Sequence, residues 1–173
     1  MADHNPLDAA CRARRALHVH VAACPTAAVD TEHTVYAAAA RYTIYDISRP
    51  VAEGDLLFTV AAPRPRERAI AIARAVCWIA EAAAGAGEIV IWCEDTSVAA
   101  VLRGERAATT DPLPAGLSAR LFTALKEVPC LIDAERVGTA PAPRMRDLKQ
   151  QLRSDLETLA GGATVIRLGA VDR

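Results

Sequence analysis

Hydrophobic and polar residues alternate along the first third of the chain in a way that predicts β-strands. In the segment Leu17–Ala23 the aliphatic residues lie on one side of a strand and two histidines on the other. A second strand is predicted over Thr34–Ile47, where β-branched and aromatic residues flank a run of alanines. A third is predicted at Asp55–Ala61, after a turn over Ser48–Gly54 that contains proline and glycine.

The middle of the chain changes to the spacing of a helix. Ile72, Val76 and Ile79 form an i, i+4, i+7 stripe within a helix predicted over Arg66–Ala84. The next segment, Glu88–Cys93, is apolar at consecutive positions. Such a run predicts a strand with both faces covered, inside a sheet rather than at its edge.

The remaining third predicts shorter elements. Helices are expected at Val98–Leu102 and Leu117–Leu125, with a short strand at Cys130–Ala134 between them and the end of the chain. A terminal helix with a leucine stripe is expected to begin near Arg144. Thr164–Leu168 is expected either as an added strand or as part of a tail.

Length and composition indicate one domain with its own core. The chain has 173 residues, of which 52% are hydrophobic, so a sizeable core is expected. We assign residues 1–15 to an N-terminal lead-in that is loose or briefly helical, 16–160 to the domain, and 161–173 to a C-terminal tail. The net charge is −1, so any contact with nucleic acid has to come from local arginine clusters.

The cysteines and the N-terminus suggest where the protein works. Five cysteines without a CxxC pair predict free thiols in a reducing compartment, with Cys77 and Cys93 buried. The segment MADHNPLDAACRARR lacks the apolar stretch of a secretory signal. No apolar run approaches the roughly 20 residues of a membrane span. We therefore expect a cytoplasmic protein with no membrane partner.

The order of three strands, helix, strand, helix, strand and helix resembles the ribonuclease H family. The local matches are RAIAIARAV (Arg68–Val76), VIWCEDTSVAAVL (Val90–Leu102) and VGTAPAPRMRDLKQQL (Val137–Leu152). The resemblance implies an α/β fold, namely a ribonuclease H-like mixed five-stranded sheet flanked by helices.

The resemblance also implies a chemistry. Enzymes of this family cleave the RNA strand of an RNA–DNA hybrid with two Mg²⁺ ions, which lie about 4 Å apart and need clustered oxygen ligands. The family supplies an Asp on the first strand, a Glu early in the first helix, an Asp at the end of the fourth strand and an Asp in the last helix. Mg²⁺ is therefore the expected cofactor of an active protein, and none is expected otherwise.

Carried onto this chain, the pattern is incomplete. The first-strand position falls near Val21–Ala23, where there is no acid, and the helix position falls on Arg68, one residue from Glu67. The position of the family's catalytic histidine falls in Gly138–Pro143, which contains no histidine. The resemblance leaves Glu94, Asp147 and Glu67 as catalytic candidates, and Glu94, Asp95 and Asp147 as metal candidates.

Arginines gather at the starts of the two helices that flank this site in the family. They are Arg64, Arg66, Arg68, Arg144 and Arg146. Guanidinium groups and helix N-termini both favour phosphate, so these residues could bind nucleic acid directly in place of metal. In the alternative interpretation they are solvated helix ends, or they pair with Glu67, Glu94 and Asp147.

Two further patterns allow two interpretations each. His18 and His20 have a spacing that can bind a metal, with Cys93 or Glu94 completing the site, but such a pair is more often packed or exposed to solvent. The pair Glu94-Asp95 could bind metal, but acids at this position also cap a helix start. No catalytic triad and no phosphate-binding glycine loop is present in the sequence.

We therefore hypothesise a divergent ribonuclease H-like domain whose catalytic site has degenerated, and which acts in nucleic-acid association or protein interaction. The first alternative is an active Mg²⁺-dependent nuclease that cleaves RNA–DNA hybrids. Its carboxylates would come from Asp30, Glu32, Glu67, Glu94, Asp95 and Asp147. The second alternative is a structural subunit that forms homo-oligomers through its sheet edge or its alanine-rich helix faces.

Overall fold

The strands of this protein form one mixed sheet, and its longest helix packs on one side of it. The computed structural model describes residues 5–29, 34–62, 66–93, 95–102, 113–127, 132–133, 147, 150–151, 154 and 164–168. The strands are β1 (Ala16–Val29), β2 (Thr34–Asp46), β3 (Arg49–Ala62), β4 (Glu88–Cys93), β5 (Ile132–Asp133) and β6 (Thr164–Leu168). The helices with assigned bounds are α1 (Asp8–Arg12), α2 (Glu67–Ala82), α3 (Thr96–Leu102) and α4 (Ala115–Glu127).

The strand order in the sheet is β5-β4-β1-β2-β3-β6. The neighbours β1, β2 and β3 are antiparallel, whereas β4 runs parallel to β1, β5 parallel to β4, and β6 parallel to β3. The predicted α/β class is confirmed, with β1 to β5 forming the expected mixed sheet. The segment Thr164–Leu168 adds a sixth strand, which is the first of its two expected alternatives.

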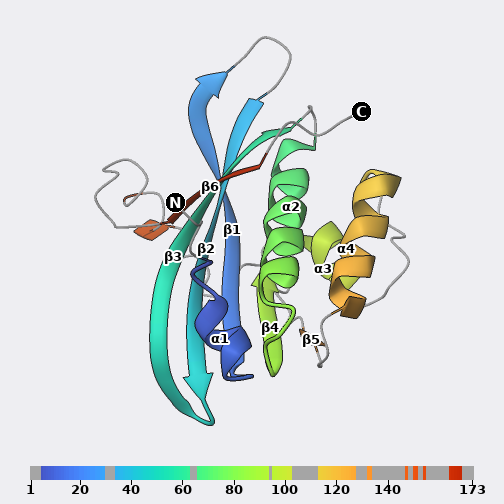
Figure 1. Cartoon of the computed structure of the whole chain (residues 1–173). Helices are drawn as coiled ribbons and strands as arrows, with labels where there is room; N and C mark the ends of the chain where they lie inside the picture. The colour runs from blue at the N-terminus through green and yellow to red at the C-terminus, as the bar shows by residue number, and fades with distance from the viewer. Residues whose placement is uncertain are drawn as a thin grey trace.

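Helix α2 covers one face of the sheet, which we call the inner face (Figure 1). It contacts β1, β2 and β3, and α4 packs on α2 rather than on the strands. The predicted stripe of Ile72, Val76 and Ile79 is fully buried. On β1, Leu17, Val19 and Val21 are fully buried in the same core, as alternation predicts.

The N-terminal lead-in contains a short helix that packs into this core. Leu7 and Ala10 are fully buried with the side chains of α2. The amide Nδ2 of Asn5 donates a hydrogen bond of 2.9 Å to the Ala82 carbonyl, at the C-terminal end of α2. The end of α2 and the start of β1 therefore lie close together.

Two predicted boundaries in the hairpin region are wrong. The turn expected over Ser48–Gly54 is a loop of only two residues between Asp46 and Arg49, and Arg49–Gly54 belongs to β3. The first strand continues past Ala23 to Val29. β6 pairs only with Leu56–Val60, so the part of β3 that contains the proline lies at the edge of the sheet. Proline is tolerated there because an edge strand does not need every N–H for pairing.

Glycine is needed at two close approaches between elements. A Cβ atom on Gly54 would lie 2.5 Å from the hydroxyl oxygen of Tyr42, which packs across the β2–β3 pair. A Cβ atom on Gly87 would collide with the carbonyl oxygen of Arg14, and the Gly87 N–H donates to the Arg15 carbonyl at 2.9 Å. Gly87 thus lets β4 start directly beside β1.

The thiols and helices fit the remaining expectations about the core. Cys77 and Cys93 are both buried, at 2% exposure, and carry no disulfide. Burial raises the pKa of the Cys77 thiol to about 12, which keeps it protonated and unreactive at neutral pH. No helix within the described residues has the length and hydrophobicity required to cross a membrane.

Candidate functional site

The end of the sheet where β1 and β4 run side by side is where the resemblance would locate metal ligands. β1 and β4 are parallel, and Val21 on β1 lies opposite Cys93 on β4. The next residue of β1 is Ala22, and the residue that follows β4 is residue 94. Glu94 itself lies outside the described residues. The residues Val21, Ala22 and Ala23 are 0%, 0% and 1% exposed. No side-chain oxygen is available at this part of β1.

The row of residues across the sheet at Ala22 is apolar. Ala22 pairs with Ala39 on β2, and Ala39 pairs with Leu57 on β3. All three are buried, although they lie on the face of the sheet opposite α2, which we call the outer face. Two hard cations need several oxygen ligands, and this row provides packing instead.

The start of α2 comes close to the same end of the sheet. A helix of 16 residues is about 24 Å long, which corresponds to about seven residues of strand. Because α2 ends beside the start of β1, its first residue, Glu67, lies near the level of Ala22 and Ala23. The helix position that the resemblance implies falls on Arg68, so Glu67 is one residue away from it.

The first residues of α2 differ in orientation. One carboxylate oxygen of Glu67, Oε2, is buried, whereas Arg68 is exposed and Arg66, the residue before the helix, is half-buried. Adjacent helix positions differ by about 100°, which accounts for the opposite orientations. A carboxylate in the first helical turn is also favoured by the helix dipole.

Asp95 caps a helix. Its Oδ1 accepts a hydrogen bond of 3.1 Å from the backbone N–H of Val98 in the first turn of α3. The Asp95 carbonyl also accepts a weak hydrogen bond from the Cys93 thiol, with Sγ at 3.6 Å. The geometry supports the capping interpretation of this acid, and the interaction draws its oxygen toward the helix backbone.

Asp147 is exposed and helical. Gln151, four residues later, accepts a hydrogen bond of 2.9 Å through Oε1 from Nη1 of Arg41 on β2. Residues four apart share one side of a helix, so Asp147 lies on the side that Gln151 uses to reach the outer face. Gln151 is therefore tied to the sheet near the apolar row.

The guanidinium of Arg41 is held by Asp55 as well as by Gln151. Arg41 donates to both carboxylate oxygens of Asp55 on β3, with Nε–Oδ1 at 2.8 Å and Nη2–Oδ2 at 2.9 Å. The side chains are 30% and 18% exposed. Burial, and secondly the charge of Asp55, raise the pKa of Tyr42. Sequence reasoning did not identify Arg41 or Asp55, because their pairing depends on a register that only the hairpin fixes.

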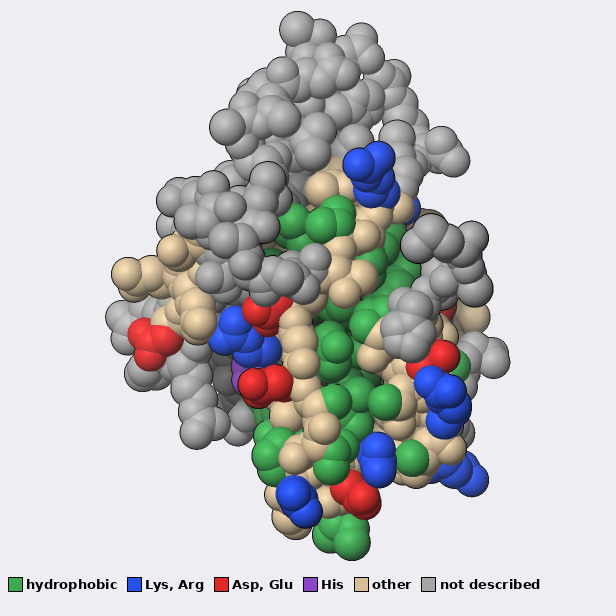
Figure 2. Space-filling model, turned by 60° about the vertical axis from the view of Figure 1, so that its left-hand side comes forward, with side chains coloured by type: hydrophobic (Ala, Val, Ile, Leu, Met, Phe, Trp, Pro, Cys, Tyr) green, Lys and Arg blue, Asp and Glu red, His purple; other side chains and the backbone are tan. Residues whose placement is uncertain are grey.

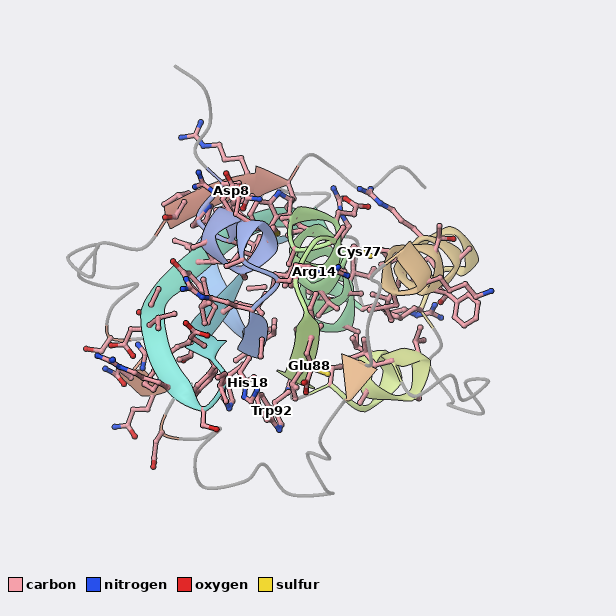
Figure 3. The ribbon with its side chains drawn as sticks, turned by 60° about the horizontal axis from the view of Figure 1, so that its bottom comes forward. Asp8, Arg14, His18, Cys77, Glu88 and Trp92 are labelled. Carbon is pink, nitrogen blue, oxygen red and sulfur yellow. The ribbon has the colours of Figure 1, made fainter. Side chains whose placement is uncertain are left out.

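The outer face carries a group of aromatic side chains beside Arg41, which sequence reasoning also missed. His20 stacks on Trp92 with ring centroids 4.5 Å apart, and His18 makes tilted contacts with Trp92 and Tyr45 at 5.2 and 4.7 Å. Figure 3 shows His18 and Trp92 together, toward the end of the sheet where β1 and β4 begin and where Glu88 lies. The alternation of β1 was the available signal, because it assigns both histidines to the outer face.

The predicted histidine–cysteine metal site is contradicted. Cys93 pairs with Val21 and belongs to the core on the inner face, whereas His18 and His20 project from the outer face. A thiol and two imidazoles on opposite faces of one sheet cannot share an ion. Among the described residues, no three His, Cys, Asp or Glu side chains lie close enough to hold a metal ion.

Several candidates lie outside the described residues. They are Glu94, Arg64, Arg144, Arg146, Asp30 and Glu32. On the face drawn in Figure 2, described acidic and basic side chains are interspersed, with no continuous basic surface. On this face, any arginine contribution is therefore local.

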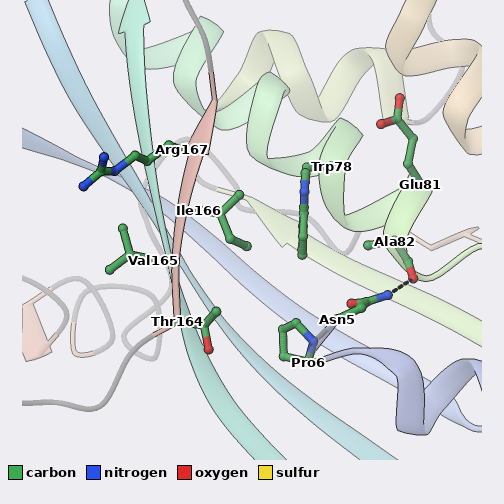
Figure 4. A pocket seen from close by; sticks show the side chains of 9 residues that line it. All are labelled: Asn5, Pro6, Trp78, Glu81, Ala82, Thr164, Val165, Ile166 and Arg167. Carbon is green, nitrogen blue, oxygen red and sulfur yellow. Dashed lines mark hydrogen bonds between the residues drawn. The ribbon is translucent and has the colours of Figure 1, made fainter. Parts of the chain in front are cut away.

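A pocket of about 1050 Å³ lies away from these residues. It opens between α2 and β6, with Trp78, Ala82 and Ile166 among its lining residues (Figure 4). Ala82 is the last residue of α2, so the pocket lies toward the opposite end of that helix from Glu67. None of the carboxylates predicted from the sequence lines it.

The arrangement of strands and helices is similar to that of several solved ribonuclease H structures. Ribonuclease H1 from Halobacterium salinarum NRC-1 is 20% identical with a TM-score of 0.54, covering 84% of this chain and 99% of that one. The N-terminal ribonuclease H domain of Rv2228c from Mycobacterium tuberculosis is 16% identical with a TM-score of 0.50, covering 83% and 99%. LC9-RNase H1, a type 1 enzyme with the type 2 active-site motif, is 12% identical with a TM-score of 0.54, covering 87% and 74%.

No protein-family model matches the chain, and a search of curated proteins finds no significant match. The structural similarity defines the class: this is a protein with a ribonuclease H-like fold. The resemblance stated from the sequence is confirmed at that level.

Proposed function

We propose that this protein is a ribonuclease H-like domain that binds nucleic acid without metal-dependent cleavage. The observation that carries the proposal is the buried apolar row of Ala22, Ala39 and Leu57, where the fold would need an oxygen ligand between two metals. The capping role of Asp95 supports it further, because that carboxylate is engaged by the backbone of α3.

The described residues near this end of the sheet do not fit a pair of Mg²⁺ ions. Such ions keep near-octahedral oxygen shells and are usually held by several carboxylates. Of the described candidates, Glu67 is at the start of α2, Asp95 caps α3 and Asp147 is exposed on the C-terminal helical segment. We therefore assign no reaction step to a metal.

Arginines at the start of α2 are proposed to contact phosphate. Arg68 is exposed in the first turn of a 16-residue helix, and Arg66 directly precedes it. The positive end of the helix dipole and the guanidinium both attract an anion. Arg64, Arg144 and Arg146 belong to the same proposed surface.

The test is the affinity for a fluorescently labelled RNA–DNA hybrid, measured by anisotropy at constant ionic strength with either EDTA or Mg²⁺. We expect equal binding in both, and a loss of about tenfold in Arg68→Glu, since one phosphate contact becomes a repulsion. Arg12→Glu is the matched control, because Arg12 is an exposed arginine in α1 at the other end of the sheet. Binding that requires Mg²⁺ would contradict the proposal.

A metal-dependent nuclease is the second candidate. It is favoured by Glu67, whose buried Oε2 lies near the level of Ala22 along the sheet, as an early helix ligand would. Its remaining ligands would be drawn from Glu94, Asp95 and Asp147, with Mg²⁺ as cofactor. Cleavage of the hybrid separates this candidate from the first.

A further inference from the structure

The outer face near the start of β1 carries a surface that the proposed function does not use. We call it the aromatic patch and define it as His18, His20, Tyr45 and Trp92 on three adjacent strands. All four side chains are half-buried, so each retains some contact with solvent. The rings contact one another at centroid distances of 4.5 to 5.2 Å, which fixes their orientation before any ligand arrives.

A small residue lies beside the patch, between an acid and a ring. Ala16 lies between Glu88 on β4 and Tyr45 on β2 in the paired strands, and His18 is the next residue of β1 on the same face. The carboxylate of Glu88 and the ring of Tyr45 therefore border the same short side chain on the outer face.

The charges that border the patch are acidic. Glu88 and Glu53 are both exposed, and Glu53 shares a row with His18 through Thr43. Neither forms a salt bridge with another residue in the part of the chain that the structure describes. Figure 2 shows a histidine side chain beside acidic and basic ones on this side of the molecule.

The described basic side chain beside the patch already has an acidic partner. Arg41, which lies opposite His20, is held by both oxygens of Asp55. Among the residues that the structure describes, Glu88 and Glu53 therefore leave negative charge beside the patch. A phosphate backbone would be repelled there, whereas a cation would be attracted.

We propose that the aromatic patch binds a cationic side chain, preferably an arginine, from a basic segment of a protein partner. Aromatic faces attract cations, and a planar guanidinium can stack on a ring while it donates hydrogen bonds to a carboxylate. The patch lies on the outer face of the sheet, whereas Arg68 belongs to α2, which covers the inner face. Both surfaces can therefore be occupied together.

The experiment uses Trp92 as its own reporter. The chain has two tryptophans, so Trp78→Phe leaves Trp92 as the single fluorophore. A nine-residue arginine peptide is titrated at low salt, against a glycine–serine peptide of equal length. We expect a saturable change in Trp92 fluorescence with the arginine peptide alone, weakened about threefold in Glu88→Gln and about tenfold in Glu53→Gln/Glu88→Gln. Glu81→Gln is the control, an exposed acid on α2 outside the patch.

Two results would overturn the inference. One is an affinity for the arginine peptide that is the same in the wild type and in Glu53→Gln/Glu88→Gln. Both substituted side chains are exposed, so this variant should fold normally and the result could not be attributed to misfolding. The other is a Trp92 response to a single-stranded oligonucleotide that Tyr45→Leu removes, which would assign the patch to unpaired bases. Neither result bears on whether Arg68 contacts the RNA–DNA hybrid, so the two proposals fail independently.

Discussion

The two faces of the sheet are formed by the same strands but carry different kinds of side chain. On the inner face, Leu17, Val19 and Val21 of β1 are fully buried against α2, and this pattern continues along the strand. On the outer face, His18 and His20 join aromatic and charged neighbours and remain half-exposed. One strand thus provides packing to one side and chemical groups to the other.

The outer face itself changes character along β1. After His20 comes Ala22, which is as fully buried as any residue of the inner face. The ribonuclease H-like fold would have its metal ligand near this residue. The outer face is therefore apolar in the row of Ala22 and polar in the neighbouring row, which contains Arg41 and Asp55.

Phe58→Ala tests the inner face and should have the largest effect. Phe58 is fully buried and meets Trp78 edge-to-face at 5.5 Å, so its removal should lower the free energy of unfolding by about 4 kcal/mol. Urea denaturation measures it. Phe122, which is 46% exposed, is the matched control. Phe122→Ala should lower the free energy of unfolding by less than about 1 kcal/mol. Similar losses in the two variants would refute the assignment of the core.

Arg41→Ala and Asp55→Ala test the polar row on the outer face. A double-mutant cycle should give a coupling energy of about 2 kcal/mol, because the pair is bidentate and mostly shielded from water. The exposed pair Arg15 and Asp46, at 3.4 Å, should give less than about 0.5 kcal/mol in the same cycle. Equal coupling in the two pairs would show that the outer face is no more ordered than ordinary surface.

Ile47→Gly tests the hairpin tip, where neither face is covered. Ile47 is 95% exposed with φ of 58°, a conformation that a β-branched residue adopts at a cost. We expect the glycine variant to gain about 1 kcal/mol in the free energy of unfolding, since glycine takes this φ without strain. Val51→Gly, in the adjacent strand, should instead lose a few tenths to about 1 kcal/mol. A loss in Ile47→Gly would contradict the hairpin geometry.

The sequence was most informative where one periodicity extends through a whole element. The alternation of β1 and the stripe of α2 predicted which side chains are buried, because burial on one face depends only on spacing. Boundaries were missed where tertiary pairing outweighs local preference. Pro25 does not end β1, since β2 continues to pair with this part of the strand, where Pro25 lies opposite Tyr36.

The candidate site was less predictable than the fold. Its carboxylates come from separate elements, and no local pattern specifies how they converge. The pairing of Arg41 with Asp55 follows from a hairpin register set by a loop of two residues, Ile47 and Ser48, that lacks the usual glycine or asparagine signal. The sequence alone showed that the first-strand position implied by the resemblance is apolar, because Ala22 and its neighbours in the sequence carry no acid.

The most direct test of the central claim is a single-turnover cleavage assay, with the protein in excess over a labelled RNA–DNA hybrid in Mg²⁺ or Mn²⁺. Excess protein reveals even one slow round of chemistry. The account predicts that the hybrid is bound and stays intact with either metal. Metal-dependent cleavage that disappears in Glu94→Gln would contradict it and would identify the protein as a nuclease with an unusual ligand set.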